Sequence, residues 1–271
     1  MKTRRIFNTF CVAVWLAAQT AVSVRAATTT ITATRETAIF AENPDYNLGV
    51  GNLIVGTSAS GADTARSLLA FELAAAIPAG SRINSVTFAI GVIRQSNHNV
   101  ESAYALHRFL KDWTEGRGGA GVNNGSPALP GETTWNRQAH GGTAWNAPGT
   151  QVGTEFTAAA SGTGPVIDSI GITYTIDSTA ALVADVQAWL DTPAANKGWI
   201  FRGTSEGAAG TARRFSSKAV VDGTSAGLIP RITVDYTPGV VAAAPGPIHA
   251  LGGVALGIAL FVWRTRRGWV R

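Results

Sequence analysis

Residues 83–93, INSVTFAIGVI, alternate large apolar side chains with small or polar ones. Val86, Phe88, Ile90 and Val92 hold every second position of this stretch. Successive side chains of a β-strand point to opposite faces of a sheet. The stretch therefore predicts a strand that has one face in a hydrophobic core.

Similar alternation recurs on both sides of this strand, with turn residues between the segments. It covers residues 67–73, 104–109, 170–176 and 231–236, and the Thr-rich residues 28–34 are also prone to form a strand. Many short strands separated by turns are typical of an all-β sandwich or barrel. We therefore expect one all-β domain over residues 27–238.

One short segment has helical spacing instead. Its apolar stripe is formed by Leu182, Val186, Trp189 and Leu190. This spacing predicts a single helix near residues 178–190 with Asp177 or Ser178 as its N-cap.

Residues 114–165 show little alternation and are rich in Gly and Asn. Loops of this length inside a compact domain are either functional or disordered. The tryptophans of this stretch argue against disorder, because disordered segments are poor in aromatic residues. We expect binding residues here.

The first 26 residues have the features of a secretory signal peptide. A basic start precedes an apolar stretch over residues 6–18, and small residues end at Ala26. We expect cleavage after Ala26 and export of the domain. Cys11 is the only cysteine and lies in this segment, so the exported body has no thiol for a disulfide or a metal site.

The C-terminal end reads as a sorting or anchoring tail. Residues 239–247 form a Pro/Ala/Gly linker, residues 248–267 an apolar helix with an arginine cluster, and residues 268–271 a short cytoplasmic tail. This order resembles sorting signals of the PEP-CTERM type, although residues 244–247 read APGP and lack the Pro-Glu-Pro triplet. The resemblance implies removal by an exosortase-type enzyme. The alternative is a retained transmembrane helix with the domain facing outward.

The charge of the chain is divided unevenly. The full sequence has a formal net charge of +5, but eight of its 22 Lys and Arg lie in residues 1–26 and 246–271, which hold no acid. Residues 27–245 therefore carry 14 basic residues against all 17 Asp and Glu, a net charge of −3. Nucleic-acid binding requires clustered basic residues, so we expect no nucleic-acid partner.

Catalytic motifs are weak. The pattern GxSxG occurs at residues 203–207 and 223–227, but a nucleophile elbow needs a helix straight after the serine and a later histidine. Both serines lie in Gly-rich turns, and the only later histidine is His249 in the C-terminal tail. His107 lies in a predicted strand and His140 in the long loop. We expect no enzyme activity and no cofactor. A lyase or hydrolase that uses either histidine is the least favoured alternative.

Calcium binding is a further alternative. Asn43, Asp45 and Asn47 place several oxygen ligands in one short loop, without the spacing of an EF-hand. A turn rich in Asx residues between two strands explains the same pattern.

Tryptophans are the most informative candidates for binding. Sugars present apolar faces that stack on aromatic rings, with polar groups around them. Trp135 and Trp145 lie in the polar loop and are the preferred candidates for exposed platforms, with a structural plug as the alternative. Trp113 closes a predicted strand and fits either role.

The order of the segments resembles the DNRLRE (disaggregatase-related) domain, which overlaps carbohydrate-binding module family 96. The matching pieces are residues 37–40, 43–49, 53–56, 66–73 with 77–80, 106–108 with 112–116, 134–135, 185–190 with 196–199, 212–217 and 230–236. The resemblance implies a jelly-roll-like antiparallel β-sandwich with one short helix, found outside the cell on surface proteins or beside polysaccharide-degrading enzymes. It also implies acidic polysaccharides as ligands for some members.

Arginines supply a second set of candidates. Arg66, and Arg213 with Arg214, either pair with Asp112 or Glu115 or reach a sugar carboxylate through bidentate hydrogen bonds. We expect an exported or cell-surface binding module for a polysaccharide or exopolysaccharide. The alternative is a structural or adhesive protein of the envelope or biofilm matrix.

Overall fold

The computed structural model describes residues 25–119, 125–219 and 228–239. Within them lie one α-helix, α1 (Ala180–Asp191), one turn of 3-10 helix, η1 (Pro193–Ala195), and thirteen strands. The strands are β1 (Ala27–Thr32), β2 (Arg35–Phe40), β3 (Tyr46–Asn47), β4 (Leu53–Thr57), β5 (Thr64–Ala70), β6 (Arg82–Gln95), β7 (Tyr104–Arg108), β8 (Ser126–Pro127), β9 (Gly162–Thr163), β10 (Ile172–Ile176), β11 (Trp199–Gly203), β12 (Arg213–Phe215) and β13 (Arg231–Thr237). The predicted all-β class is confirmed.

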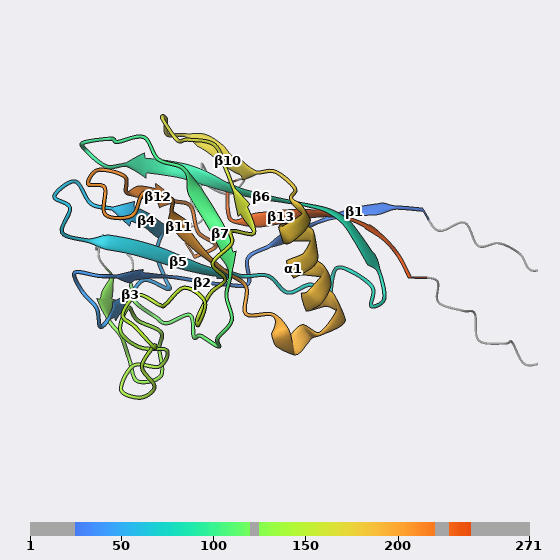
Figure 1. Ribbon diagram of the computed structural model, residues 1–271, viewed down its shortest axis with the longest axis horizontal. Coiled ribbons are helices and arrows are strands. Elements are labelled where there is room, and N and C mark those ends of the chain that lie inside the picture. The colour runs from blue at the N-terminus through green and yellow to red at the C-terminus, as the bar shows by residue number, and fades with distance from the viewer. Residues whose placement is uncertain (1–24, 120–124, 220–227, 240–271) are drawn as a thin grey trace, which may run out of the picture. The chain divides into compact units, whose positions relative to one another are not determined.

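The strands pair antiparallel in the order β1-β13-β6-β12-β4-β5-β11-β7-β9, and β10 also pairs with β6. The long strand predicted from residues 83–93 is β6, which pairs with β13, β12 and β10 (Figure 1). Most strand neighbours are far apart in sequence, as expected when short strands are joined by long connections.

Strand β4 joins the two halves of this sheet. Its first three residues pair with β12, whereas Gly56 and Thr57 pair with β5. Gly56 has φ +105°, and a Cβ there would lie 2.6 Å from the carbonyl oxygen of Thr211. Glycine is therefore required at the point where the strand turns from one half to the other.

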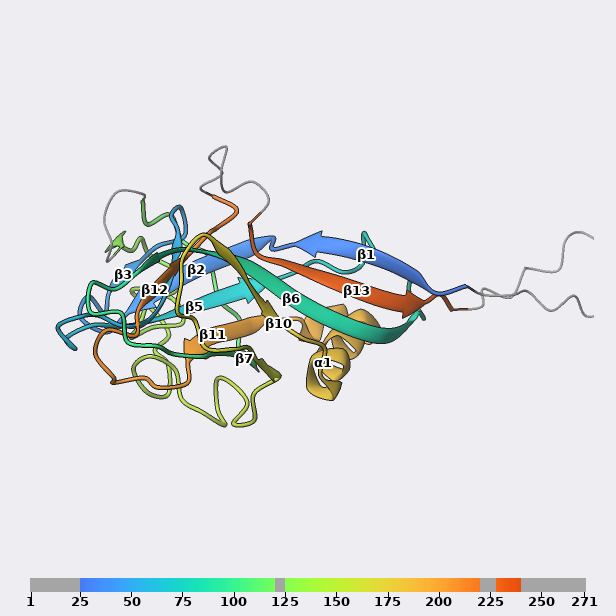
Figure 2. The same cartoon turned by 90° about the horizontal axis from the view of Figure 1, so that it is seen from above.

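The two halves face one another across the main core. Phe88 of β6 and Phe215 of β12 both contact Phe201 of β11, with ring centroids 5.7 and 5.0 Å apart respectively. The edge-on view shows β6, β13 and β1 on one side of this core and β11 and β7 on the other (Figure 2). The inward positions of β6 are Val86, Phe88, Ile90 and Val92, as the alternation predicts.

Helix α1 closes one end of the core with its predicted apolar stripe. Its N-cap is Thr179, whose hydroxyl oxygen accepts the amide of Leu182 at 3.0 Å, so the prediction of Asp177 or Ser178 is wrong. Ser178 is used elsewhere, because its hydroxyl oxygen accepts the amide of Val86 in β6. Asp185 of the helix accepts the indole N–H of Trp199 at 2.8 Å.

The long loop covers the outer face of the β5–β11 half. Phe109, Trp113, Trp145 and Phe156 form a second apolar cluster with Leu68, Ala70 and Ile200. The three strand residues alternate with main-core residues, so they point outward and need a cover. The described part of the loop thus forms a layer over these strands.

The segments expected at the two ends fall mainly outside the described residues. These are the signal peptide over residues 1–26, the linker over 239–247, the apolar helix over 248–267 and the tail over 268–271. In the described part of the chain, no helix combines the length and the apolar character that crossing a bilayer requires.

Candidate functional site

Two arginines stand side by side on the outer face of β6 and β12. Arg214 pairs with Arg94 in the antiparallel register. Directly opposite residues in such a pair point to the same face, so the two guanidinium groups are neighbours. The residues flanking Arg214, Arg213 and Phe215, are buried on the other face of β12.

A β-bulge explains why Arg94 points outward. The inward positions of β6 are even-numbered up to Val92, and continued alternation would turn Arg94 into the core. The register instead shifts between Arg214 and Phe215, where Phe215 pairs with Val92 and Ile93 is the extra residue. Bulges often redirect side chains next to functional sites. Sequence alternation alone therefore missed Arg94.

The two arginines line a hollow of about 260 Å³, which we call the arginine hollow. Ile54 and Gly56 of β4 contribute to it, as do the residues that follow Arg94. Two lining oxygens, Gln95 Oε1 and Ser96 Oγ, are buried and have no hydrogen-bond partner among the described residues. Buried polar atoms of this kind are normally paired, so they are suited to ligand hydroxyl groups.

The arginine hollow is electropositive at its arginine end. Burial, and then the charge of Arg94, lower the pKa of Arg214. Asp63 also lines the hollow, but its Oδ1 accepts the amide of Glu42 at 2.9 Å, and burial raises the pKa of its carboxyl group. A ligand carboxylate or sulfate in the hollow would accept charge-assisted hydrogen bonds from guanidinium groups at this end.

Arg213 does not have the exposure that a ligand contact requires. It is 1% exposed, and its guanidinium donates to Asn99 Oδ1 at 2.8 Å and to the carbonyl oxygens of Val100 and Ile167 at 3.0 and 3.2 Å. It therefore fastens connecting segments to β12. Both arginines of the predicted pair line the hollow, but Arg213 is fully buried there.

The predicted tryptophan platforms are corrected by burial. Trp145 is 6% exposed, packs against Phe109 and donates its indole N–H to the carbonyl oxygen of Thr134. Trp113 is 4% exposed and donates to the carbonyl oxygen of Lys197. Both rings plug the second apolar cluster, so neither offers a face to a sugar.

Trp135 is half-buried, and part of its ring is covered. The guanidinium of Arg66 lies 5.1 Å from the ring centroid. Gly149 lies so close that a Cβ there would be 2.4 Å from the ring. Trp135 therefore contacts both Gly149 and Arg66, and the pairing of its ring with Arg66 was not expected from the sequence.

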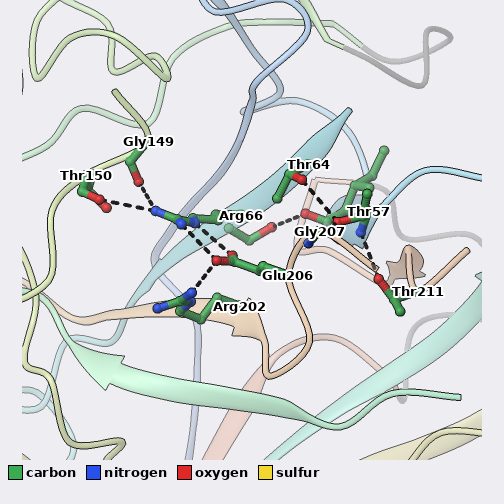
Figure 3. Close-up of polar contacts among 11 residues, drawn as sticks. Thr57, Thr64, Arg66, Gly149, Thr150, Arg202, Glu206, Gly207 and Thr211 are labelled. Atoms are coloured by element: carbon green, nitrogen blue, oxygen red, sulfur yellow. Dashed lines mark hydrogen bonds and ion pairs between the residues drawn. The ribbon is translucent and has the colours of Figure 1, made fainter. Parts of the chain in front are cut away.

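Arg66 and Arg202 share the carboxylate of Glu206 (Figure 3). Arg66 donates to both Glu206 oxygens at 2.8 Å and also to the carbonyl oxygens of Gly149 and Thr150. The three groups lie outside the core on β5, on β11 and in the turn after it. Arg66 thus pairs with a carboxylate of the protein, which was one of its two expected roles. Its partner is Glu206, however, and not Asp112 or Glu115.

The expected acidic partners bind lysines instead. Asp112 pairs with Lys197, and Glu115 pairs with Lys218 at 2.7 Å. These pairs join segments distant in sequence, which is why spacing along the chain did not identify them.

The GxSxG motifs show no catalytic arrangement in the described residues. Ser205 is exposed in the turn after β11, without a following helix, and Ser225 lies outside the described residues. His107 of β7 has its Nδ1 atom 2.9 Å from the carbonyl oxygen of Thr157. His140 has its Nδ1 atom 3.8 Å from Asp45.

The loop proposed for calcium is occupied by internal contacts. Asn47 Oδ1 accepts the amide of Gly118 at 2.8 Å, and its Nδ2 donates to Glu132 at 3.0 Å. Asp45 lies beside His140, and the Asn43 carbonyl oxygen accepts the amide of Tyr46. No group of three or more His, Cys, Asp or Glu side chains suited to a metal ion occurs within the described ranges.

Comparison with known proteins returned no match, either among protein-family models or among curated proteins.

Proposed function

We propose that this protein is a non-catalytic binding module for an acidic polysaccharide, with the arginine hollow as its site. The observation that carries the proposal is the pair of directly opposed arginines, Arg94 and Arg214, at the wall of a polar hollow. Two guanidinium groups at one wall can together bind a ligand carboxylate or sulfate through charge-assisted hydrogen bonds.

The packing of the tryptophans supports an acidic rather than a neutral glycan. Neutral sugars are held largely by stacking on aromatic faces, and four of the five described tryptophans are buried while the fifth lies against Arg66. Recognition through guanidinium groups instead favours ligands that carry carboxylate or sulfate groups. The volume of the hollow lies just below the usual range for small-molecule sites, about 300–1,000 Å³, and suits a single sugar unit of a longer chain.

The same proposal includes the finer fold and the location. A jelly-roll-like β-sandwich accounts for two sheet halves around one core and for neighbours distant in sequence. The resemblance to the DNRLRE domain supports both this topology and an extracellular glycan partner. The basic, apolar N-terminal segment and the apolar C-terminal run support export to the cell surface.

The test is affinity electrophoresis of the full chain in mild detergent, through gels that contain polygalacturonate, a sulfated galactan or a neutral glucan. We expect retardation by an acidic polymer and none by the neutral one. Arg94→Gln and Arg214→Gln should each weaken binding about tenfold or more, because a hydrogen bond to a charged group contributes about 1.5–3 kcal/mol.

Arg82→Gln is the matched control, because it removes the same charge from an exposed position at the other end of β6. It should leave retardation unchanged. Equal retardation of wild type and both hollow variants would rule out the arginine hollow. Absence of retardation by every acidic polymer would favour a structural or adhesive role.

A further inference from the structure

A second hollow lies over β7 and β11, outside the main core. Its volume is about 300 Å³, and it exists because small side chains, Ala105, Ala158 and Ala160 among them, leave space between His107 and Arg202. This second hollow and the arginine hollow have no lining residue in common.

Arg202 belongs to a cluster of side chains that has an excess of positive charge. Glu206 is a single carboxylate that pairs with both Arg202 and Arg66, so the three groups together carry one net positive charge (Figure 3). The Arg202 guanidinium also lies 5.3 Å from the ring centroid of Phe156. Its Nε atom is buried and has no hydrogen-bond partner among the described residues. A buried donor without a partner is unfavourable, so an acceptor from a ligand would complete this cluster.

His107 supplies a different polar group on the other wall. A carbonyl oxygen only accepts, so the contact between Nδ1 and Thr157 places the ring proton on Nδ1. The neutral ring then has Nε2 as an acceptor, suited to a sugar hydroxyl. Burial lowers the pKa of His107, and the charge of Arg202 lowers it further. Hydrogen bonds to the backbone of Thr157 and Ala159 and the charge of Glu206 act in the opposite direction, and the net shift is downward.

The two hollows lie on opposite faces of the domain. Phe201 and Phe215 touch across the core with ring centroids 5.0 Å apart. The next residue on β11 is Arg202, and the residue before Phe215 on β12 is Arg214. Successive strand residues point to opposite faces, so each arginine points away from the core, and the two point away from each other.

We propose that the hollow between His107 and Arg202 is a second binding site for an anionic sugar unit, so that one domain holds two polysaccharide chains on opposite faces. Arg202 binds the carboxylate or sulfate, and the neutral His107 orients a neighbouring hydroxyl. The ligand class rests on the proposed function, whereas the site itself rests on the cavity and the incomplete Arg202 cluster.

The test is isothermal titration of the full chain in mild detergent with a galacturonic acid tetrasaccharide and, separately, a sulfated galactose tetrasaccharide. Cellotetraose is the neutral probe. We expect two sites per chain for at least one anionic probe. Ala158→Trp places a large ring in the hollow while it leaves Arg202, Arg66 and Glu206 unsubstituted, and it should reduce the stoichiometry from two to one. Ala75→Trp is the control, because Ala75 is exposed and lines neither hollow.

The arms separate this inference from the proposed function. Arg214→Gln should also leave one site, and Ala158→Trp combined with Arg214→Gln should leave none. A wild-type stoichiometry of one that Ala158→Trp does not change would overturn the second site. A single site that Ala158→Trp abolishes and Arg214→Gln leaves intact would support it and overturn the arginine hollow. Circular dichroism of each variant establishes that it is folded.

Discussion

The opposed pair of Arg94 and Arg214 has a measurable effect on the stability of the free protein. Like charges directly opposite one another on neighbouring strands are destabilising, by about 0.2–1 kcal/mol. Arg94→Gln should therefore raise the free energy of unfolding by this amount at low ionic strength, even though it weakens glycan binding. Urea unfolding at 10 mM and 1 M NaCl measures the effect, which should shrink at high salt. A destabilised variant would mean that the arginine has a structural role instead.

Glu36 of β2 predicts a dependence of stability on pH. Its carboxyl group is buried, with Oε2 unpaired among the described residues, and burial raises its pKa to about 7 despite two backbone amides that donate to Oε1. The unfolded chain has the lower pKa, so the folded state holds the proton more tightly. Stability from this group is fully present below pH 4.5 and is lost as the pH rises to about 7.

Glu36→Gln carries no titrating proton at this position. The variant should therefore not show the loss of folding stability that Glu36 causes as the pH rises. The free energy of unfolding of the variant relative to wild type should rise by about 3 kcal/mol between pH 4 and pH 8, since each pKa unit corresponds to about 1.4 kcal/mol. Urea unfolding across this range measures it. A difference that does not vary with pH would contradict the buried, protonated carboxyl.

At the scale of the elements, the long loop contributes a buried aromatic side chain to the packing of the sheet. Trp145 belongs to the loop but acts as core for the outer face of β5 and β11. Trp145→Ala should lower the free energy of unfolding by about 3–5 kcal/mol, as for other large buried aromatics, and leave glycan retardation per folded molecule unchanged. The half-buried Trp135 gives the matched comparison, with a smaller loss expected. A Trp145 variant that is stable but no longer binds would restore the platform interpretation.

Sequence alternation is sufficient to predict β6, β7, β10 and β13, because alternate residues of each strand belong to the main core. It fails at Ile93, where one extra residue in the bulge changes which side chains point outward, and such a residue has no pattern of its own. It also fails at the N-cap, because Ser178 and Thr179 are equivalent until β6 takes the Ser178 hydroxyl.

The candidate site could be predicted only in part, because it also depends on contacts between segments that are distant in sequence. Arg214 is one of the arginines that the sequence analysis names as candidates. Arg94, in contrast, depends on the bulge, and Glu206 on a contact 140 residues away in sequence. The tryptophans of the loop were misassigned because a polar sequence around a ring does not reveal the apolar strand face beneath it.

At the scale of the whole molecule, a net acidic body carries two local sites of positive charge. Binding should therefore depend strongly on salt, because the Debye length falls from about 30 Å at 0.01 M to about 3 Å at 1 M. We expect the affinity for an acidic tetrasaccharide to fall about tenfold or more between these concentrations. Titration at both salt concentrations measures it. An affinity that does not vary with salt would indicate stacking rather than ionic recognition.

Strand β4 gives this arrangement a mechanical consequence. Chains held on opposite faces of the domain would pull its two sheet halves apart under tension. Packing between phenylalanine rings resists such a load only weakly once it opens, but β4 runs through both halves as one covalent backbone. A matrix crosslinked in this way would bear load through a continuous peptide strand, with Gly56 as the point about which the two halves can bend before they separate.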